Sequence, residues 1–198
     1  MAEITGKQLQ GVQWYGKDLC QVELNGADLR QAVLAEANLT HADLRGADLS
    51  GADLSGADLY HADLSGARLQ GAILREAQLF HCNLDHADLS DACLVKANLN
   101  TSTARYACFN NADFYEATLY DADLSGAQIC GADLFHADLF HACLQKADLT
   151  GSDLSDCYLS NADLTETILA GVELSGATMP DGEICAPGSR GVCLPTVK

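Results

Sequence analysis

The sequence predicts an all-β solenoid in which the chain winds into a four-sided coil and successive coils pair like strands of a parallel sheet. Two observations predict this fold. A five-residue unit, Ala-Asp/Asn-Leu-x-x, repeats without insertion or deletion from Leu9 to Met179, which is 35 consecutive units. In addition, residues twenty apart are alike on the outward positions. The central Leu is called position i, and it is Leu in all seventeen units from Leu19 to Leu99.

A period of five excludes a long helix and a straight strand. On an α-helix each Leu would lie about 140° from the previous one, so no apolar face would form. On a strand, successive Leu residues would alternate between faces. The chain must therefore turn once per unit, with i−2 and i pointing inward. Of the 17 glycines, 15 occupy i+2, where the turn is expected to need a positive φ.

The number of sides follows from residues that recur at intervals of twenty. The recurring i+1 residues are Tyr60, Phe80, Tyr120 and Phe140, and the recurring i+2 residues are His41, His61, His81 and His141. Four units per coil explain this spacing and predict about nine coils, each rising about 4.8 Å.

The β-helix is expected to cover residues 1–181, followed by an irregular cap or tail over 182–198 that is rich in Pro and Gly. Positions i and i−2 should be buried from Val12 to Met179, and positions i+1 and i+2 exposed. Representative core residues are Leu44, Leu49, Leu54, Leu59, Leu64, Phe109 and Phe114.

The unit at residues 101–105 departs from the pattern, because Ser102 replaces the inner Ala and Ala104 replaces the inner Leu. The five-residue phase continues, so the backbone should stay on the coil, and Phe109 and Phe114 nearby are available to refill the core. Two interpretations stay open: a tolerated defect, or a seam between two repeat modules.

The run from Ala27 to Leu69, with ADLRG, ADLSG and ADLYH, resembles the pentapeptide repeat family over nearly the whole chain. The stretch from Ala177 to Gly182 is similar to the ends of cyanobacterial members. This resemblance implies a right-handed quadrilateral parallel β-helix with i and i−2 inside. It also implies little about function, although the best-understood members mimic DNA and bind DNA gyrase or topoisomerase IV.

The net charge of the chain limits which partners can be expected. The chain has 28 acidic and 11 basic residues, a net charge of −17. This argues against nucleic acid or an anionic membrane as direct partners and permits a basic protein surface. With no apolar run long enough to span a membrane and no visible signal peptide, a cytoplasmic location is expected.

The nine cysteines are predicted to be free thiols, as in a reducing compartment. Cys82 and Cys157 take the place of the inner Ala. Pairing of Cys185 with Cys193 in the tail is the alternative. A column of His41, His61 and His81 is a weak candidate for zinc or copper, and no cofactor is otherwise indicated.

No catalytic motif or phosphate loop is present, so an enzyme is not expected. The sequence favours a rigid protein-interaction or structural module that uses an exposed aromatic edge: Tyr60, Phe80, Tyr120 and Phe140. The alternative is a DNA mimic, because residues 106–184 hold 14 acids and one base and contain one acidic column: Asp113, Asp133, Asp153 and Glu173. Monomer and end-to-end dimer both stay open.

Overall fold

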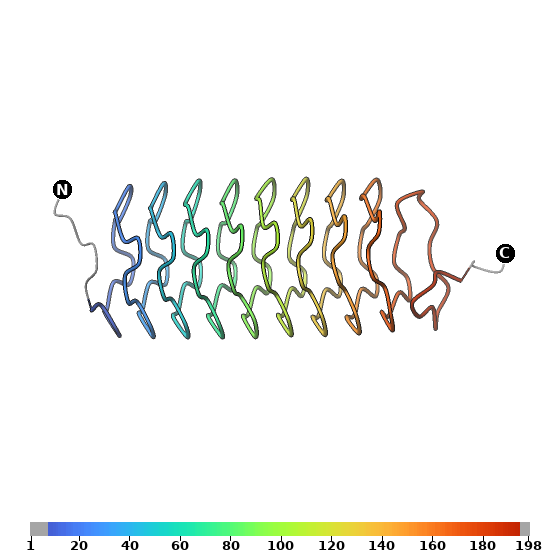
Figure 1. Ribbon diagram of the computed structural model, residues 1–198, viewed down its shortest axis with the longest axis horizontal. Coiled ribbons are helices and arrows are strands. Elements are labelled where there is room, and N and C mark those ends of the chain that lie inside the picture. Colours follow the sequence, from blue (N-terminus) through green and yellow to red (C-terminus); the bar gives the residue numbers. More distant parts are fainter. Residues whose placement is uncertain (1–7, 195–198) are drawn as a thin grey trace.

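The computed structural model describes residues 8–194, which form one elongated parallel β-helix (Figure 1). None of these residues lies in a helix, and each unit contributes a single bridge residue, at i−1, in place of a longer strand. The parallel bridges join residues twenty apart, from Gln8↔Asp28 to Tyr158↔Thr178. The predicted four units per coil are therefore confirmed.

Backbone hydrogen bonds link each coil to its neighbours on every side. The N–H groups of i−1, i and i+2 donate to carbonyls of adjacent coils, as from Leu64 to Asn83 at 2.7 Å. The N–H of i−2 donates to the preceding position i and closes a turn, as from Ala67 to Leu64 at 2.9 Å. Four of the five N–H groups of a unit are paired in this way.

The turns have the positive φ that the glycine pattern predicts, and they have it in units without glycine as well. All i+2 residues from Gly11 to Gly176 have φ > 0, and 21 of them are not glycine. Positive φ at the third residue of a four-residue turn is the feature that a type II turn requires. Thr101 is the β-branched residue among them, with a φ of 56°, where branching at Cβ makes this conformation most strained.

The fifth N–H group, at i+1, explains why Asp or Asn precedes the inner Leu. In most units it donates to the i−1 side chain of its own unit, as from Ser65 to Asp63 Oδ1 at 2.9 Å. This Asx turn makes the i−1 carboxylate or amide part of the turn.

Where i−1 is not Asp or Asn, a side chain of the preceding coil can supply the acceptor. Asn100 Oδ1 accepts from the Tyr120 N–H at 2.8 Å, because Thr118 occupies i−1 of that unit. Asn110 Oδ1 accepts from the Cys130 N–H at 2.9 Å in the same way, because Gln128 occupies i−1 of that unit. Asp85 Oδ1 likewise accepts from the Arg105 N–H at 2.9 Å.

The core is a stack of Leu and Ala, as predicted for its central part. Every i and i−2 residue from Leu24 to Ala162 is buried, including all seven representative core residues. The predicted buried range, Val12 to Met179, extends too far at both ends, because an end coil is packed on one side only. The partly buried apolar residues there are Leu9, Val12, Trp14, Leu19, Val22, Leu164, Leu169 and Met179.

Two i+1 residues are buried, contrary to the prediction that this position is exposed. Ala35 and Val95 are 9 % and 6 % exposed. Both are short apolar side chains, and Val95 lies in its column between the longer Arg75 and Tyr115. Longer neighbours twenty residues away therefore shield a small side chain at this position.

The unit at 101–105 stays in register, with parallel bridges from Asn83 to Thr103 and from Thr103 to Asp123. Ala104 is fully buried, and the Ser102 hydroxyl donates to the Leu99 carbonyl at 2.7 Å. Phe109 and Phe114 contribute inner residues to the same coil, and their ring centroids are 5.2 Å apart. The missing Leu thus coincides with two enlarged inner residues.

The tail reverses direction and closes the C-terminal end of the coil. Antiparallel bridges join Thr178 to Ile184 and Glu173 to Arg190. A disulfide links Cys185 to Cys193 with a Cα–Cα distance of 4.9 Å. The prediction of free thiols is therefore wrong for these two cysteines, because chain reversal brings them together; residues 195–198 of the predicted tail lie outside the described residues.

The other cysteines match their predicted roles. Cys82 and Cys157 are buried at inner positions, and burial raises the pKa of both thiols. The Cys82 thiol also donates to the Leu59 carbonyl at 2.7 Å. These two cysteines therefore act as small core residues.

Candidate functional site

One outward face carries aromatic side chains in two adjacent columns. We call these the aromatic ridge, which comprises Tyr60, Phe80, Tyr120 and Phe140 at i+1 and His41, His61, His81 and His141 at i+2. Tyr60 stacks on Phe80 with ring centroids 5.8 Å apart and planes 9° from parallel. Tyr120 stacks on Phe140 at 5.5 Å and 4°. The predicted recurrence at twenty residues thus places these rings in stacked pairs.

The histidines of the ridge are also stacked. His61 lies between His41 and His81, with ring centroids 5.2 and 4.8 Å away and planes 5° and 10° from parallel. Rings stacked face to face direct their nitrogens side by side and not toward a common point. Within residues 8–194, no group of three His, Cys, Asp or Glu side chains is arranged to hold a metal ion.

Burial, followed by the neighbouring His81 and His41, lowers the pKa of His61. A lowered imidazole pKa in the folded state means that the unfolded state binds the proton more readily. The stability contributed by this ring is therefore present at neutral pH and is lost as the pH falls through the imidazole range.

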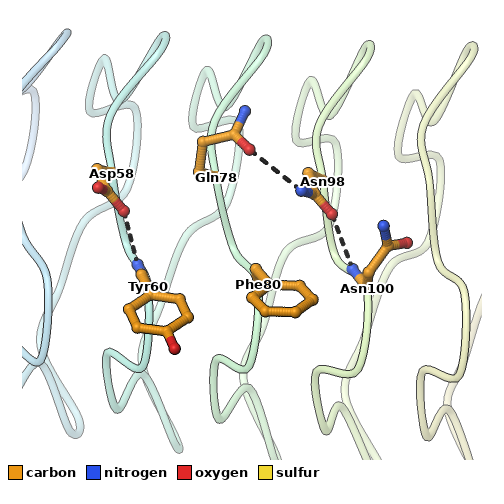
Figure 2. Close-up of a pocket in the computed structure, with 6 residues that line it drawn as sticks. All are labelled: Asp58, Tyr60, Gln78, Phe80, Asn98 and Asn100. Atoms are coloured by element: carbon orange, nitrogen blue, oxygen red, sulfur yellow. Dashed lines mark hydrogen bonds between the residues drawn. The ribbon is translucent and has the colours of Figure 1, made fainter.

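A shallow groove of about 380 Å³ runs beside the i+1 column (Figure 2). It spans three coils, and its walls are two parallel rows of side chains: Asp58, Gln78 and Asn98 in one, and Tyr60, Phe80 and Asn100 in the other. The Asn98 amide donates to Gln78 Oε1 at 3.1 Å, and Asn98 Oδ1 accepts from the Asn100 N–H at 3.1 Å. The polar wall is therefore held in place by its own hydrogen bonds.

This groove was missed by the sequence reasoning, although a signal for it exists. Asn38, Asp58, Gln78 and Asn98 recur at intervals of twenty at i−1, next to the aromatic column. Amides that follow one another in a column can bond from coil to coil, which identical Asp residues cannot do.

A second ring pair lies on a different face. Tyr115 stacks on Phe135 with centroids 5.9 Å apart. Beside it, Lys96 Nζ lies 3.3 Å from Glu116 Oε2. His136 packs edge-on against Phe135 at 4.2 Å, and this group provides a matched comparison for the ridge.

The acidic column is assembled as predicted. Parallel bridges join Asp113 to Asp133, Asp133 to Asp153, and Asp153 to Glu173. Within the described residues, none of the ion pairs involves the three aspartates, whereas Glu173 pairs with Arg190 at 3.1 Å. The carboxylates therefore form an uncompensated negative row that ends at a cation of the tail.

The same aspartates also hold the turns. Asp133 Oδ1 accepts from the Phe135 N–H at 2.9 Å, and Asp113 and Asp153 make the equivalent bonds at 3.0 and 2.9 Å. An acidic side chain at i−1 is thus explained by the fold before any partner is considered.

We expect Asp133→Ala to lower the free energy of unfolding by about 1 kcal/mol, because the Phe135 N–H loses its acceptor. Asp133→Asn keeps an Oδ1 acceptor and should be close to neutral. Urea denaturation of both variants measures the difference. Equal destabilisation by Ala and Asn would show that the charge, and not the Asx bond, matters at this position.

Acids in the N-terminal half are more often paired with arginine. Arg30 lies 2.7 Å from Asp28, and Arg45 lies 2.6 Å from Asp43. The hydrogen bond from Arg30 lowers the pKa of Asp28 to about 2. The two ends of the β-helix therefore differ in charge.

Over residues 8–194, the structure has no helix with the length and apolar character needed to cross a membrane.

A family model described as pentapeptide repeats matches this chain in 8 copies. The matched residues are 18–51, 62–100, 82–119, 97–134, 117–156 and 142–180. A search among curated proteins finds no match.

Several solved structures are similar. HetL, a pentapeptide repeat protein involved in heterocyst differentiation regulation from the cyanobacterium Nostoc sp. strain PCC 7120, is 35% identical over 91% of this chain and 92% of that chain, with a TM-score of 0.56. Rfr23 from the cyanobacterium Cyanothece 51142 is 36% identical over 46% of this chain and 58% of that chain, with a TM-score of 0.39.

QnrB1, a plasmid-mediated fluoroquinolone resistance protein, is 20% identical over 83% of this chain and 90% of that chain, with a TM-score of 0.45.

Proposed function

Because the chain belongs to the pentapeptide repeat family, whose members fold as right-handed quadrilateral β-helices, we propose that it is a non-catalytic module that binds a partner protein through the aromatic ridge. Members of this family are generally structural or interaction modules. The observation that carries the proposal is the arrangement of eight aromatic and imidazole rings on one outward face. Exposed aromatic residues held in fixed positions are typical of binding hot spots.

The rigidity of the ridge supports this proposal. Tyr60 and Tyr120 are 37 % and 41 % exposed, yet each is stacked on a neighbour and fixed to a hydrogen-bonded coil. A partner that binds there orders few side chains, which reduces the entropy lost on association.

The similarity to HetL supports the same class of function. HetL is described as involved in the regulation of heterocyst differentiation. A regulatory role of that kind is compatible with binding to another protein, and we extend it to this chain as part of the proposal.

We place the module in the cytoplasm. Seven cysteines between Cys20 and Cys157 are free, which supports a reducing compartment. The bridge between Cys185 and Cys193 does not support it.

The test compares two variants of the tagged protein in affinity capture from a lysate of the source organism. The ring variant replaces Tyr60, Phe80, Tyr120 and Phe140 by Ser. The amide variant replaces Asp113, Asp133 and Asp153 by Asn, and Glu173 by Gln. We expect a specific partner of the wild type to be lost from the ring variant, by at least tenfold, and to be retained by the amide variant.

The matched control is Tyr115→Ser with Phe135→Ser, which removes a stacked pair from another face. Each lost pair is worth about 0.5–1.5 kcal/mol, so all variants should stay folded by circular dichroism. Retention of the partner by the ring variant would contradict the proposal.

The second candidate function is DNA mimicry directed at gyrase or topoisomerase IV. The observation that favours it is the acidic column across consecutive coils, in which the three aspartates make no ion pair within the described residues and Glu173 pairs with Arg190. A basic DNA-binding groove would be the partner, and binding would weaken steeply with salt. Inhibition of gyrase supercoiling by about 10 μM protein, lost in the amide variant, would favour this candidate over the first.

A further inference from the structure

Both columns of the aromatic ridge are interrupted at the same coil. Asn100 stands where the i+1 column would place a ring between Phe80 and Tyr120, and Thr101 stands where the i+2 column would place an imidazole next to His81. The i+1 column therefore has a gap one coil wide, which we call the notch, and the i+2 column beside it lacks an imidazole at both Thr101 and Asp121. Figure 2 shows Asn100 in line with Tyr60 and Phe80. This interruption is the starting point of the inference.

Along the axis of the β-helix, the notch has the length of one missing ring. Phe80 and Tyr120 are two coils apart, about 10 Å at the spacing of parallel strands. The short Asn100 side chain stands at the midpoint, so a planar ring seated over its amide would have a ring neighbour about 5 Å away along the axis on each side, within the range of stacked aromatic pairs. The stacked pairs on either side of the notch have comparable spacings, 5.8 and 5.5 Å.

The floor of the notch is fixed and polar. Asn100 Oδ1 is engaged by the Tyr120 N–H, whereas its Nδ2 makes no hydrogen bond within the described residues. The Thr101 hydroxyl donates to the Asn100 carbonyl at 2.6 Å and lies 2.8 Å from His81 Nδ1. A side-chain amide donor is thus presented to an incoming group while the surrounding side chains are held in place.

The surroundings of the notch are negative. Asp58 lines the far end of the adjoining groove, two coils from Asn100, and none of the groove-lining residues is basic. Asp121 follows Tyr120 on the far wall and lies 3.5 Å from His141 Nδ1. A nucleic-acid base is disfavoured by this charge. An aromatic residue next to a Lys or Arg complements the negative charge, since the cation can lie near Asp58 or Asp121 and against the aromatic rings of the ridge.

We propose that this notch binds an aromatic side chain from a basic segment of the partner protein, which completes the interrupted ring column. The inference rests on the proposed function and specifies the chemistry that the ridge recognises. Binding replaces the missing ring and adds one stacking contact on each side, with Phe80 and with Tyr120. The Asn100 amide and the flanking carboxylates orient the segment.

The probe is an acetylated, amidated peptide with the sequence Lys-Trp-Lys, and its control is Lys-Leu-Lys. Both are titrated into the full-length protein and followed by proton NMR. We expect the indole protons to move upfield, because they enter the shielding region of two rings. We also expect the Trp peptide to bind at least tenfold more tightly than the Leu peptide.

The decisive variant fills the notch. Asn100→Phe supplies the missing ring, and Thr118→Asp in the same protein restores an acceptor for the Tyr120 N–H. The matched control is Asn110→Phe with Gln128→Asp. It makes the same two types of substitution at a position off the ridge, where Asn110 Oδ1 accepts from the Cys130 N–H. The first double variant should lose the upfield shift and the tenfold preference, and the second should keep both.

Equal affinity for the two peptides, or an unchanged indole shift in the notch-filled variant, would overturn the inference. Its failure is distinguishable from failure of the proposed function. A partner that is lost from the ring variant but bound normally by the notch-filled variant would refute the notch and leave the ridge as the binding face. A partner retained by the ring variant would refute the ridge, whatever the peptides do.

Discussion

Leu64→Asp is expected to unfold the coils around residue 64 and to abolish the native circular dichroism spectrum near room temperature. Leu64 is fully buried within a column of other leucines. Its replacement removes a core side chain, at a cost of about 2–5 kcal/mol. It also buries a carboxylate without a partner, which adds several kcal/mol.

The control for this experiment is Ser65→Asp, one residue along the chain. Ser65 lies at i+1 on the outside of the same coil, so an added carboxylate there stays in contact with water. Its melting temperature should remain within a few degrees of the wild type. A near-native melt of Leu64→Asp would show that position i does not face the core.

Ala104→Leu is expected to destabilise the protein by about 1–3 kcal/mol, although it restores the most common residue at position i. The coil that contains Ala104 also contains Phe109 and Phe114 as inner residues, and their rings touch at a centroid distance of 5.2 Å. A leucine at 104 would be the fourth large residue at position i of that coil, with Phe109, Phe114 and Leu119, and two of these are larger than the usual Leu, so we expect it to be overpacked. Thermal melts of the variant measure the loss.

The compensating variant combines Ala104→Leu with Phe114→Leu, which reduces the inner volume of the same coil. We expect the double variant to recover at least half of the stability lost in Ala104→Leu, as coupled neighbours do. If Ala104→Leu alone raises the melting temperature, the coil contains a void and the two phenylalanines do not fill it.

The five-residue period was sufficient to predict the path of the chain, because turns and inner positions follow directly from where Leu, Ala and Gly recur. The columns at residues 60, 80, 120 and 140 were predicted for the same reason: in a coil of fixed length, sequence spacing determines which side chains are neighbours. Burial of Leu64 and stacking of Tyr60 on Phe80 are both consequences of register.

Features that depend on side-chain chemistry between coils could not be read from the period. The bond from the Tyr120 N–H to Asn100 forms in a unit whose i−1 residue is Thr118, and the Thr118 hydroxyl donates to Asn98 Oδ1 at 3.3 Å, so residues in two coils must be considered together. The groove beside Phe80 depends on how Gln78 and Asn98 orient toward each other. The link between Cys185 and Cys193 depends on a reversal in a tail that has no repeat.

The left-handed backbone at position i+2 has a consequence for how the protein folds and unfolds. At 21 positions a residue other than glycine adopts this conformation, at a cost of about 1–2 kcal/mol each. A solitary five-residue unit cannot offset that cost, since most of its hydrogen bonds are made to the coils on either side. We therefore expect formation of the first pair of coils to be the slow step of folding, with each later coil added to an existing edge twenty residues away. Because an end coil is packed on one side only, we expect unfolding to begin at the ends, so that protection of a turn from unfolding grows with the number of coils between it and the nearest end.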